Sequence, residues 1–294
     1  MLIIAWPTIE TQLARLYTCS RAFAVSTGMT ALDIILRLIK PGDVVLAGTD
    51  IYGGTDRLLT YLKTQGGADV RHLDLDIKDR LQEVLDEAGE KVKMVLVESP
   101  TNPLLKIADL RMISELVHAA SPDALVVVDN TMMSPYLQRP LNLGADIVYD
   151  SGTKYLSGHH DVMAGILAVE RDDVAKRVAF MINSTGTGLA PQDCFLLLRG
   201  LKTLSIRMDR QASTAHLVAL YLDALGFHVN FPGLPTHPDR DIHYGQADGA
   251  GAVLSFTTGD ISASERIVGG TRLWGISVSF GCVNSLISMP CVMS

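Results

Sequence analysis

The sequence predicts an α/β protein in which a mostly parallel sheet carries helices on both faces. Short continuous runs of valine, leucine and isoleucine alternate with segments whose apolar residues recur every three or four positions, over roughly residues 20–170. Such runs indicate strands buried on both faces, and the alternation indicates helices that connect parallel strands. With 294 residues, of which 48% are apolar and 19% charged, the chain can form one large or two smaller domains.

The predicted elements follow one another regularly through the first part of the chain. Strands are expected at residues 22–25, 43–47, 70–75, 94–97, 124–128, 145–149 and 165–169. Amphipathic helices are expected at residues 8–16, 30–39, 58–66, 81–89 and 110–121, and all but the first end near a glycine or proline that stops a helix. Ligands in such sheets bind beyond the carboxyl ends of the strands, so polar residues at those ends are the candidate site.

The pattern changes after about residue 198. The last part is expected to contain a long helix, a polar loop rich in proline, glycine, histidine and aspartate, and two strands, at residues 201–225, 232–251, 252–257 and 275–280. We therefore expect a domain boundary near Gly200. It would separate a ligand-binding α/β domain of residues 1–200 from a smaller, incomplete α+β domain of residues 201–294.

Composition excludes several classes of function. The formal charge of −7 argues against non-specific binding to nucleic acid or to a membrane surface, because both require basic patches. No apolar run approaches the ~20 residues of a transmembrane helix. The four cysteines are scattered without a Cys-x-x-Cys pair, which favours reduced thiols, and the apolar start at residues 1–7 is too short for a signal peptide. We therefore expect a cytoplasmic protein.

Two motifs suggest ligands that we do not expect. His237, Asp239, Asp241 and His243 have the chemistry of metal ligands, but they lie in the polar loop, and a solvated loop is the preferred interpretation. Residues 186–188 resemble part of a dinucleotide-binding loop, but they follow a helical pattern instead of a strand. Neither a metal nor a dinucleotide is predicted.

One lysine, Lys154, stands among small hydroxyl and glycine residues directly after an apolar run, within the segment Asp150–Asp161. A lysine at the carboxyl end of a buried strand is partly removed from water, which lowers the pKa of its amine. Such a lysine is a candidate nucleophile that forms Schiff bases with carbonyl compounds and with pyridoxal 5'-phosphate (PLP). The alternative is a solvated loop lysine.

An aspartate at another strand end strengthens the first interpretation. Asp129 ends a fully apolar strand, where a buried carboxylate is costly unless it pairs with a cation. The protonated pyridine nitrogen of PLP would be such a cation. The alternative is that Asp129 only caps a turn.

A phosphate site can also be assembled from strand ends. Thr27, Gly28 and Met29 open a helix, where backbone N–H groups and the positive end of the dipole suit an anion. Ser151 and Thr153 could add hydroxyl donors to the same anion. The alternative is an ordinary helix N-cap.

Two further residues complete the candidate site. Tyr52 lies beside glycines in the segment Asp50–Thr55 and offers a flat ring face to a cofactor. Asn102 lies in a turn at Glu98–Pro103 that either aims it inward or caps the following segment. Together with Lys154, these residues predict PLP as the cofactor.

The segments around Lys154 and Asp129, the segments Tyr52–Thr55 and Glu98–Pro103, and the segment Arg199–Leu204 resemble those of the Cys/Met-metabolism family of PLP-dependent enzymes. The resemblance runs in order from Pro7 to Ser294. The family includes cystathionine β-lyases, γ-lyases and γ-synthases and homoserine-ester sulfhydrylases. The segment Gly275–Leu286 most resembles fungal cystathionine β-lyases. The resemblance implies a fold of the aspartate aminotransferase type, in which the first domain binds PLP.

The resemblance also implies roles for individual residues. Lys154 would bind the cofactor aldehyde and shuttle a proton, and Tyr52 would stack on the cofactor ring as a second catalytic residue. Asp129 would hold the pyridine nitrogen, and Ser279 would lie near the substrate carboxylate. The remaining cofactor-binding residues would be Thr27, Gly28, Met29, Asn102, Ser151 and Thr153.

The implied reaction is cleavage of the Cβ–S bond of cystathionine to homocysteine, pyruvate and ammonia, in methionine biosynthesis and transsulfuration. A γ-synthase, a γ-lyase or a sulfhydrylase is the alternative within the family. An alternative of another class is a non-catalytic, truncated relative that acts as a binding or assembly partner. The resemblance implies a homotetramer that binds a small amino-acid substrate and neither nucleic acid nor membrane.

The sequence departs from the family pattern at both ends. Ile3 stands where the family has an arginine that reaches the phosphate of a neighbouring subunit. After Ser294 the family continues with an arginine that clamps the substrate carboxylate. We therefore expect a chain that is truncated at both ends, and its activity is the open question.

Overall fold

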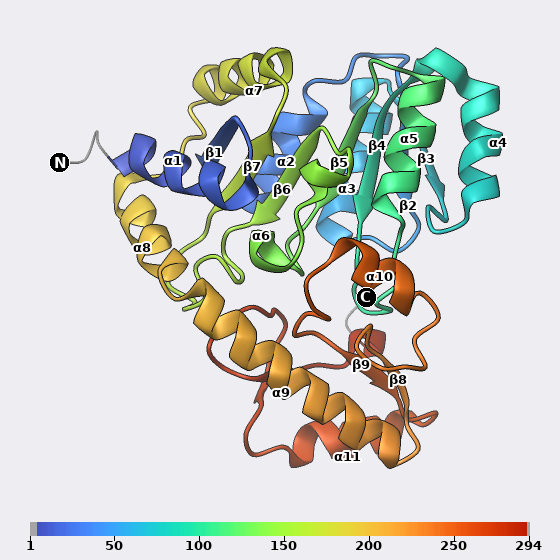
Figure 1. Cartoon of the computed structure of the whole chain (residues 1–294), viewed down its shortest axis with the longest axis vertical. Coiled ribbons are helices and arrows are strands. Elements are labelled where there is room, and N and C mark those ends of the chain that lie inside the picture. Colours follow the sequence, from blue (N-terminus) through green and yellow to red (C-terminus); the bar gives the residue numbers. More distant parts are fainter. Residues whose placement is uncertain (1–4, 293–294) are drawn as a thin grey trace.

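Seven strands form one sheet, in the order β1-β7-β6-β5-β4-β2-β3, in the computed structural model, which describes residues 5–292 (Figure 1). The strands, from β1 to β7, are Arg21–Val25, Val44–Gly48, Asp69–Leu73, Val92–Glu98, Leu125–Asp129, Ile147–Ser151 and Gly165–Val169. The five strands from β2 to β6 are parallel where they pair, and β7 is antiparallel to both β6 and β1. The predicted mostly parallel α/β fold is confirmed.

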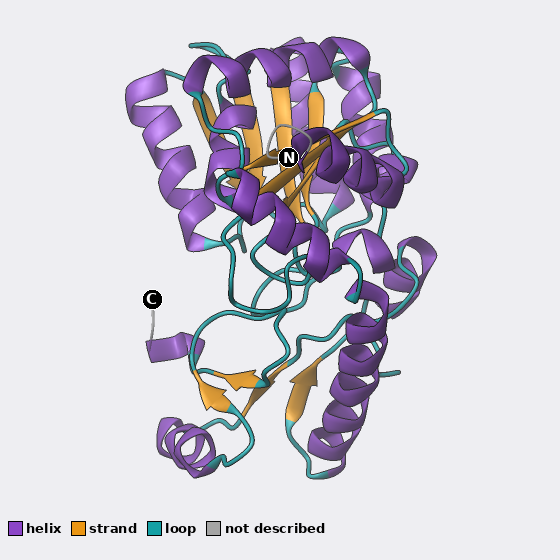
Figure 2. Cartoon of the chain, turned by 90° about the vertical axis from the view of Figure 1, so that its left-hand side faces the viewer, coloured by secondary structure: helices purple, strands orange, loops and turns teal. Residues whose placement is uncertain are grey.

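Helices cover both faces of this sheet (Figure 2). Successive residues of each strand point to opposite faces: in β2, Leu46 joins the core on one face and Val45 the core on the other. The first core is covered by α1 (Ala5–Tyr17), α4 (Lys78–Ala88), α5 (Leu110–Ala120) and α8 (Pro191–Leu201). The second is covered by α2 (Gly28–Leu36), α3 (Gly53–Gly66) and α7 (Asp172–Thr185). This burial on both faces explains the uninterrupted apolar runs.

The C-terminal part has its own small core and lies below the sheet in Figure 1. Its elements are α9 (Leu204–Ala224), β8 (His228–Asn230), α10 (Arg240–Gln246), β9 (Ser255–Thr257), α11 (Ile261–Gly270), β10 (Gly275–Ile276) and β11 (Leu286–Ile287). The core includes Ala219 and Phe231, both fully buried. A domain boundary near Gly200 stays a prediction.

The long helix expected at 201–225 is confirmed as α9, and Leu201 ends the preceding helix α8. Two other predictions for this part were wrong in detail. The polar loop at 232–251 contains α10, where His243 is fully buried and contacts the Gly249 carbonyl oxygen at 2.8 Å, so this histidine is not solvated. The strand expected at 275–280 is β10, which covers only Gly275–Ile276, and at Ser279 the backbone adopts φ of 104°.

The sheet brings four strand ends to one edge. Strands β4, β5 and β6 are parallel and end at Glu98, Asp129 and Ser151. Strand β1 runs in the same direction, because both it and β6 are antiparallel to β7, so Thr27 beyond its end reaches the same edge. A short helix, α6 (Ser134–Leu137), follows β5. The edge expected to bind a ligand therefore collects the residues singled out from the sequence.

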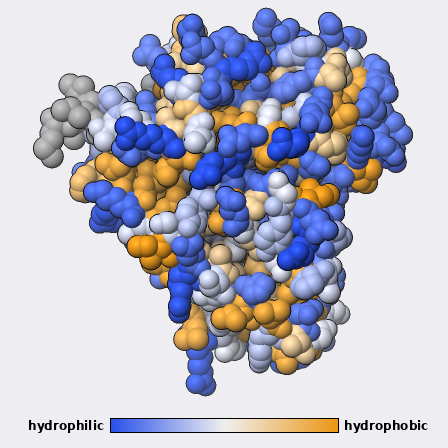
Figure 3. Space-filling view, viewed as in Figure 1, coloured by the Kyte–Doolittle hydropathy of each residue, from blue (hydrophilic) through white to orange (hydrophobic). Residues whose placement is uncertain are grey.

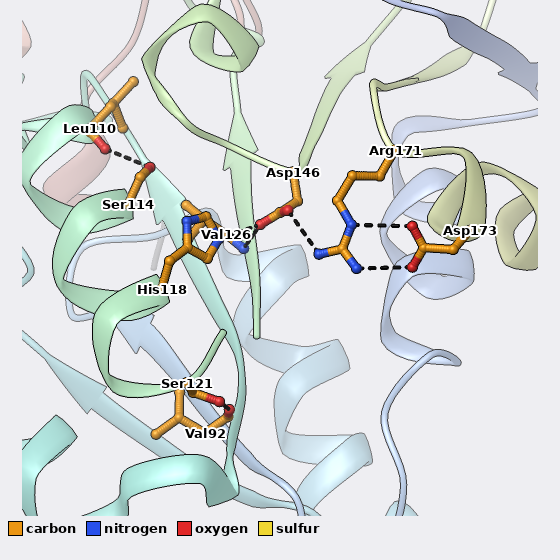
Figure 4. A network of polar contacts seen from close by, with 9 residues as sticks. All are labelled: Val92, Leu110, Ser114, His118, Ser121, Val126, Asp146, Arg171 and Asp173. Atoms are coloured by element: carbon orange, nitrogen blue, oxygen red, sulfur yellow. Dashed lines mark hydrogen bonds and ion pairs between the residues drawn. The ribbon is translucent and has the colours of Figure 1, made fainter. Parts of the chain in front are cut away.

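The opposite edge is held together by one buried carboxylate (Figure 4). Asp146 directly precedes β6 and accepts a hydrogen bond from the Val126 N–H of β5 at 2.8 Å. It also contacts His118 of α5 at 2.9 Å and Arg171, just before α7, at 3.3 Å. Arg171 in turn pairs with Asp173. This network fixes helices from both faces to the amino end of β6.

None of the helices described is long and apolar enough to cross a membrane. The four cysteines, Cys19, Cys194, Cys282 and Cys291, are free thiols. The expected departure at Ile3 and the end at Ser294 lie outside the described residues.

Candidate active site

Lys154 lies in a turn directly beyond the end of β6. Its N–H donates to the Ser151 carbonyl oxygen at 3.1 Å, and its own carbonyl oxygen accepts from the Gly158 N–H at 2.8 Å. Tyr155 and Leu156, which follow it, are buried in the core. The backbone of Lys154 is therefore fixed on both sides while its side chain extends from the sheet edge.

The amine of Lys154 meets the C-terminal part of the chain. Its Nζ donates to Ser279 Oγ at 2.6 Å and lies 5.2 Å from the centre of the Phe280 ring. Burial lowers the pKa of this amine, as expected for a lysine at the end of a buried strand. A larger fraction of Lys154 is therefore uncharged and nucleophilic than for a solvated lysine.

A glycine allows this close approach. Gly281 has φ of +83°, and a Cβ there would lie 2.7 Å from the Tyr155 nitrogen and 2.9 Å from the Lys154 Cβ. Both the backbone conformation and the contact require glycine at this position. The segment Ser279–Gly281 therefore packs directly on the Lys154 turn.

Carboxylates gather at the neighbouring strand ends. Glu98 and Asp129 are in register on β4 and β5, and burial is the main cause that raises the pKa of both. The charge of Asp129 raises the pKa of Glu98 further. The Asp129 carboxylate accepts from the Thr131 N–H at 3.0 Å, and the Tyr149 hydroxyl also bonds to it.

These carboxylates form no ion pair within residues 5–292. The Asp50 Oδ2 atom is buried without a hydrogen-bond partner among the described residues, and Asp50 and Glu98 line a cavity of about 30 Å³. Lys106 also lines this cavity, but its amine pairs with Asp74 at 3.8 Å. Neither Asp50 nor Glu98 nor Asp129 forms an ion pair with any described residue. Uncompensated buried carboxylates favour a cationic group at this edge.

The ring of Tyr52 lies over the same edge. The Tyr52 N–H donates to Glu98 Oε2 at 3.0 Å, and its ring, 56% exposed, occupies the space that a side chain at Gly54 would fill. The Met29 sulfur also lies beside Gly54. Asn102 is exposed, and its backbone N–H bonds to the Glu98 carboxylate, so the structure does not turn its side chain into a buried site.

An anion cradle lies at the start of α2. Thr27 caps this helix by accepting from the Thr30 N–H at 2.9 Å, while the N–H groups of Gly28 and Met29 have no partner within residues 5–292. A Cβ on Gly28 would lie 3.1 Å from the Ser151 Cβ and 3.4 Å from its Oγ. Glycine at position 28 thus keeps open a space bounded by two N–H donors and a hydroxyl.

The hydroxyl of Thr153, which was also predicted to bind the anion, forms a hydrogen bond elsewhere. Thr153 Oγ1 accepts from the Ala164 N–H at 3.2 Å, which ties it to the segment before β7. Ser151, by contrast, donates its N–H to Thr131 Oγ1 at 2.9 Å, and this contact joins the Lys154 turn to the Asp129 strand end.

The residues present fit PLP in three respects. The cradle at Gly28, Met29 and Ser151 suits a phosphate, Asp129 requires a cation, and Lys154 supplies an amine of lowered pKa. Sequence reasoning did not include Glu98 among the site residues, although it ends a strand next to Asp129. It also did not include Phe280 and Gly281, because their contacts with Lys154 depend on tertiary packing.

Known proteins are similar to this chain along nearly its whole length. Residues 6–294 match the family model described as Cys/Met metabolism PLP-dependent enzyme. The cystathionine beta-lyase of Neurospora crassa is 56% identical over 286 residues, which cover 97% of this chain and 62% of that relative. The chloroplastic cystathionine beta-lyase of Arabidopsis thaliana is 48% identical over 291 residues, which cover 97% of this chain and 61% of that relative. This chain thus spans about three fifths of the length of these relatives.

A solved structure agrees with the same assignment. The cystathionine gamma synthase of Xanthomonas oryzae pv. oryzae, in complex with aminoacrylate and cysteine, matches with a TM-score of 0.92 and 37% identity. The match covers 97% of this chain and 73% of that one. The fold similarity therefore includes the C-terminal part as well as the sheet, and it confirms the predicted fold class.

Proposed function

Since this chain belongs to the Cys/Met metabolism family of PLP-dependent enzymes, we propose that it is a carbon–sulfur lyase that converts cystathionine and water to homocysteine, pyruvate and ammonia. The observation that carries the proposal is the contact of the Lys154 amine with Ser279 at a strand edge that also offers an anion cradle and an uncompensated carboxylate. The 56% identity to a relative named cystathionine beta-lyase supports the choice of substrate.

PLP, when bound, supplies an aldehyde that captures amines and a cationic ring that accepts the electrons released at the substrate Cα. The N–H groups of Gly28 and Met29 and the Ser151 hydroxyl would hold its phosphate. Thr27 would shape this cradle as the helix cap, and the hydroxyl of Thr153 would contribute on release from Ala164. These roles are proposals.

Lys154 moves the proton in this scheme. Its buried amine carries less charge than a solvated one, so it can accept the proton from the substrate Cα and return it later. Ser279 Oγ accepts from the same amine at 2.6 Å and would keep it directed towards the substrate. General acid–base transfer by a positioned amine typically contributes ~10²–10⁴-fold to the rate.

The remaining residues orient the cofactor. Asp129 would hold the protonated ring nitrogen, a pairing that offsets the burial of its carboxylate. Tyr52 would stack on the ring and exclude water from one face, with its backbone fixed by Glu98. Asn102 would lie near the ring hydroxyl, although its side chain is exposed here.

A second reaction within the family has its own support. The structural match with a relative named cystathionine gamma synthase covers 97% of this chain, so γ-replacement or γ-elimination chemistry uses a closely similar frame. Elimination at Cβ yields pyruvate from cystathionine, and elimination at Cγ yields 2-oxobutyrate. The product of the reaction separates the two.

The experiment is to incubate the purified protein with PLP and cystathionine and to identify the keto acid. Pyruvate is the expected product, whereas 2-oxobutyrate would indicate γ-cleavage. The Lys154→Ala variant should form neither product and should lack the visible absorbance of the cofactor bound to this lysine. If the unaltered chain yields neither keto acid, the lyase assignment is contradicted for this chain.

Assembly and location are further proposals. A homotetramer, or another homo-oligomer, fits the apolar surface on the side where α8 and α9 run (Figure 3). Phe195, Ile206, Leu217 and Tyr221 on these helices are each at least 60% exposed. A cytoplasmic location fits the free thiols. Light scattering and fractionation test these two proposals.

A further inference from the structure

Arg207 of α9 is a buried cation that no carboxylate neutralises. It is only 8% exposed, and it forms no ion pair within the part of the chain that the structure describes. Its Nε donates to Thr203 Oγ1 and its Nη2 to the Gly200 carbonyl oxygen, both at 3.0 Å, while Nη1 is buried without a partner among the described residues. A buried, incompletely bonded guanidinium lowers the stability of the fold, so its presence here points to a role other than stability.

The guanidinium of Arg207 packs against Gly158, in the turn of residues 154–158 that carries Lys154. Gly158 has φ of +75°, and a Cβ there would overlap Cζ and Nη1 of Arg207 and lie 2.8 Å from its Nε. The side chain of Arg207 therefore fills the space left by the missing side chain of Gly158. No other residue type at position 158 fits while Arg207 stays in place.

Gly158 forms the hydrogen bond that closes the turn beginning at Lys154. Its N–H donates to the Lys154 carbonyl oxygen at 2.8 Å, and its own carbonyl oxygen accepts from the Val283 N–H at 3.0 Å. Val283 lies just after Ser279–Gly281, the segment that contacts the Lys154 amine. One residue, Gly158, thus links the guanidinium, the lysine turn and the C-terminal segment.

The junction between α8 and α9 also packs closely on the same turn. A Cβ on Gly200 would overlap the Ser157 carbonyl oxygen and lie 2.7 Å from that of Leu156. Arg207 bonds to Gly200 and to Thr203 at this junction. The turn therefore lies against a surface that Arg207 itself organises.

We propose that Arg207 is a positioning residue: its guanidinium, wedged against Gly158, holds the turn 154–158 so that the Lys154 amine meets Ser279. The effect on catalysis rests on the proposed function, whereas the effect on the lysine itself does not. Arg207 touches neither the amine nor the anion cradle, so it acts through the turn.

The direction of the effect follows from the exposure of the lysine to water. Without the guanidinium, the turn loosens and water reaches the Lys154 amine, which favours its charged form. The titratable group that faces Lys154 from the C-terminal segment is the Cys282 thiol, and it is unchanged in all the variants. The loss of Arg207 should therefore raise the pKa of Lys154.

The first test uses the cofactor-free protein and an amine reagent, trinitrobenzenesulfonate. The rate of labelling at Lys154 is measured by peptide mass spectrometry as a function of pH, with the exposed Lys91, which precedes β4, as an internal reference. In Arg207→Met, the midpoint for Lys154 should rise by on the order of one pH unit, while that for Lys91 stays constant. Arg210→Met, an exposed position on the same helix, should leave both midpoints unchanged. An unchanged Lys154 midpoint in Arg207→Met overturns the proposal.

The second test separates positioning from stability. Arg207→Lys keeps the charge but not the planar fork, so it should fold and show an intermediate midpoint. If Arg207→Met does not fold, Arg207→Lys decides alone: a midpoint equal to that of the unaltered protein overturns the proposal. When the Arg207→Met variant is loaded with PLP, its kcat should be roughly tenfold or more below that of the unaltered protein, and its KM should change less than about threefold.

The two proposals fail in different ways. If the unaltered protein neither binds PLP nor turns over cystathionine, the proposed function fails, and the labelling midpoints still decide the role of Arg207. If the unaltered protein is active and Arg207→Met matches it in kcat, in KM and in the labelling midpoint, only the positioning role is refuted.

Discussion

The Lys154 amine and the Ser279 hydroxyl, 125 residues apart in the chain, are joined by a hydrogen bond of 2.6 Å. The first residue follows the last parallel strand of the sheet, and the second lies in the C-terminal part. The position of the candidate catalytic amine therefore depends on how the C-terminal segment packs on the sheet.

Replacing Ser279 with alanine removes the acceptor that holds the Lys154 amine. The loss of one such bond costs about 1 kcal/mol, so kcat/KM should fall roughly fivefold or more. Steady-state kinetics with cystathionine measures the effect. Ser277→Ala is the matched control, because the Ser277 hydroxyl bonds only to the neighbouring Val278 carbonyl oxygen among the described residues. Equal kinetics for the two variants would show that the Ser279 contact does not serve catalysis.

Replacing Gly281 with alanine should displace the Lys154 turn. The change introduces strain at φ of +83° and a clash with the backbone of Lys154 and Tyr155. Gly259 is the control: its φ is +72°, but a Cβ there meets nothing within 4 Å. Strain alone should cost about 1–2 kcal/mol at Gly259, and the clash should add about 1–3 kcal/mol at Gly281. Urea unfolding measures both costs, and equal costs would contradict the close packing on Lys154.

The strand ends could be predicted from the sequence because each strand is an uninterrupted apolar run. Asp129 and Ser151 end such runs, and parallel strands must bring their carboxyl ends to one edge. Lys154 comes soon after Ser151 in the chain, so its position at that edge could also be predicted. Local pattern and sheet topology were sufficient for this half of the site.

The contacts of the C-terminal part could not be predicted in this way. Ser279 adopts φ of 104°, a conformation that its own sequence does not favour, because packing on the Lys154 turn imposes it. Helix α10 has seven residues, of which only His243 is buried, so it gives almost no periodic signal. Arg207 was not singled out, because a helical arginine is usually solvated.

Phosphate should bind at the start of α2 even without the rest of the cofactor. Ser151→Ala removes the free hydroxyl that faces Gly28, and Gly28→Ala fills the cradle from the helix side. Each variant should weaken the binding of inorganic phosphate and of PLP roughly tenfold, as expected for a hydrogen bond to a charged group. Ser213→Ala, on the exposed side of α9, should leave both affinities unchanged. Calorimetric titration measures the affinities, and unaltered phosphate binding in both site variants would exclude this cradle.

The charge of Asp129 should destabilise the cofactor-free protein at neutral pH. Burial raises the pKa of this carboxyl above its unfolded value of 3.8, so the folded state binds the proton more tightly than the unfolded state. The stabilising contribution is therefore fully present below the unfolded pKa and is lost as the pH rises through the folded pKa. The contribution of Glu98 to stability changes with pH in the same direction, because burial and the neighbouring Asp129 raise its pKa well above 4.5.

Asp129→Asn separates this charge from the contacts of the side chain. Asparagine keeps an oxygen for the Thr131 N–H but carries no charge. Without cofactor, the variant should be more stable than the unaltered protein at pH 7.5, by on the order of 1 kcal/mol, and the difference should shrink towards pH 4. PLP should reverse the order at pH 7.5, since a protonated ring nitrogen stabilises only the charged carboxylate. Thermal unfolding at both pH values, with and without PLP, measures these differences.

The control replaces the exposed Glu90 with glutamine, and this variant should show neither the pH trend nor the reversal. A variant that is less stable than the unaltered protein at pH 7.5 without cofactor would mean that the carboxylate is already compensated, and it would remove the physical reason for placing a cation beside it.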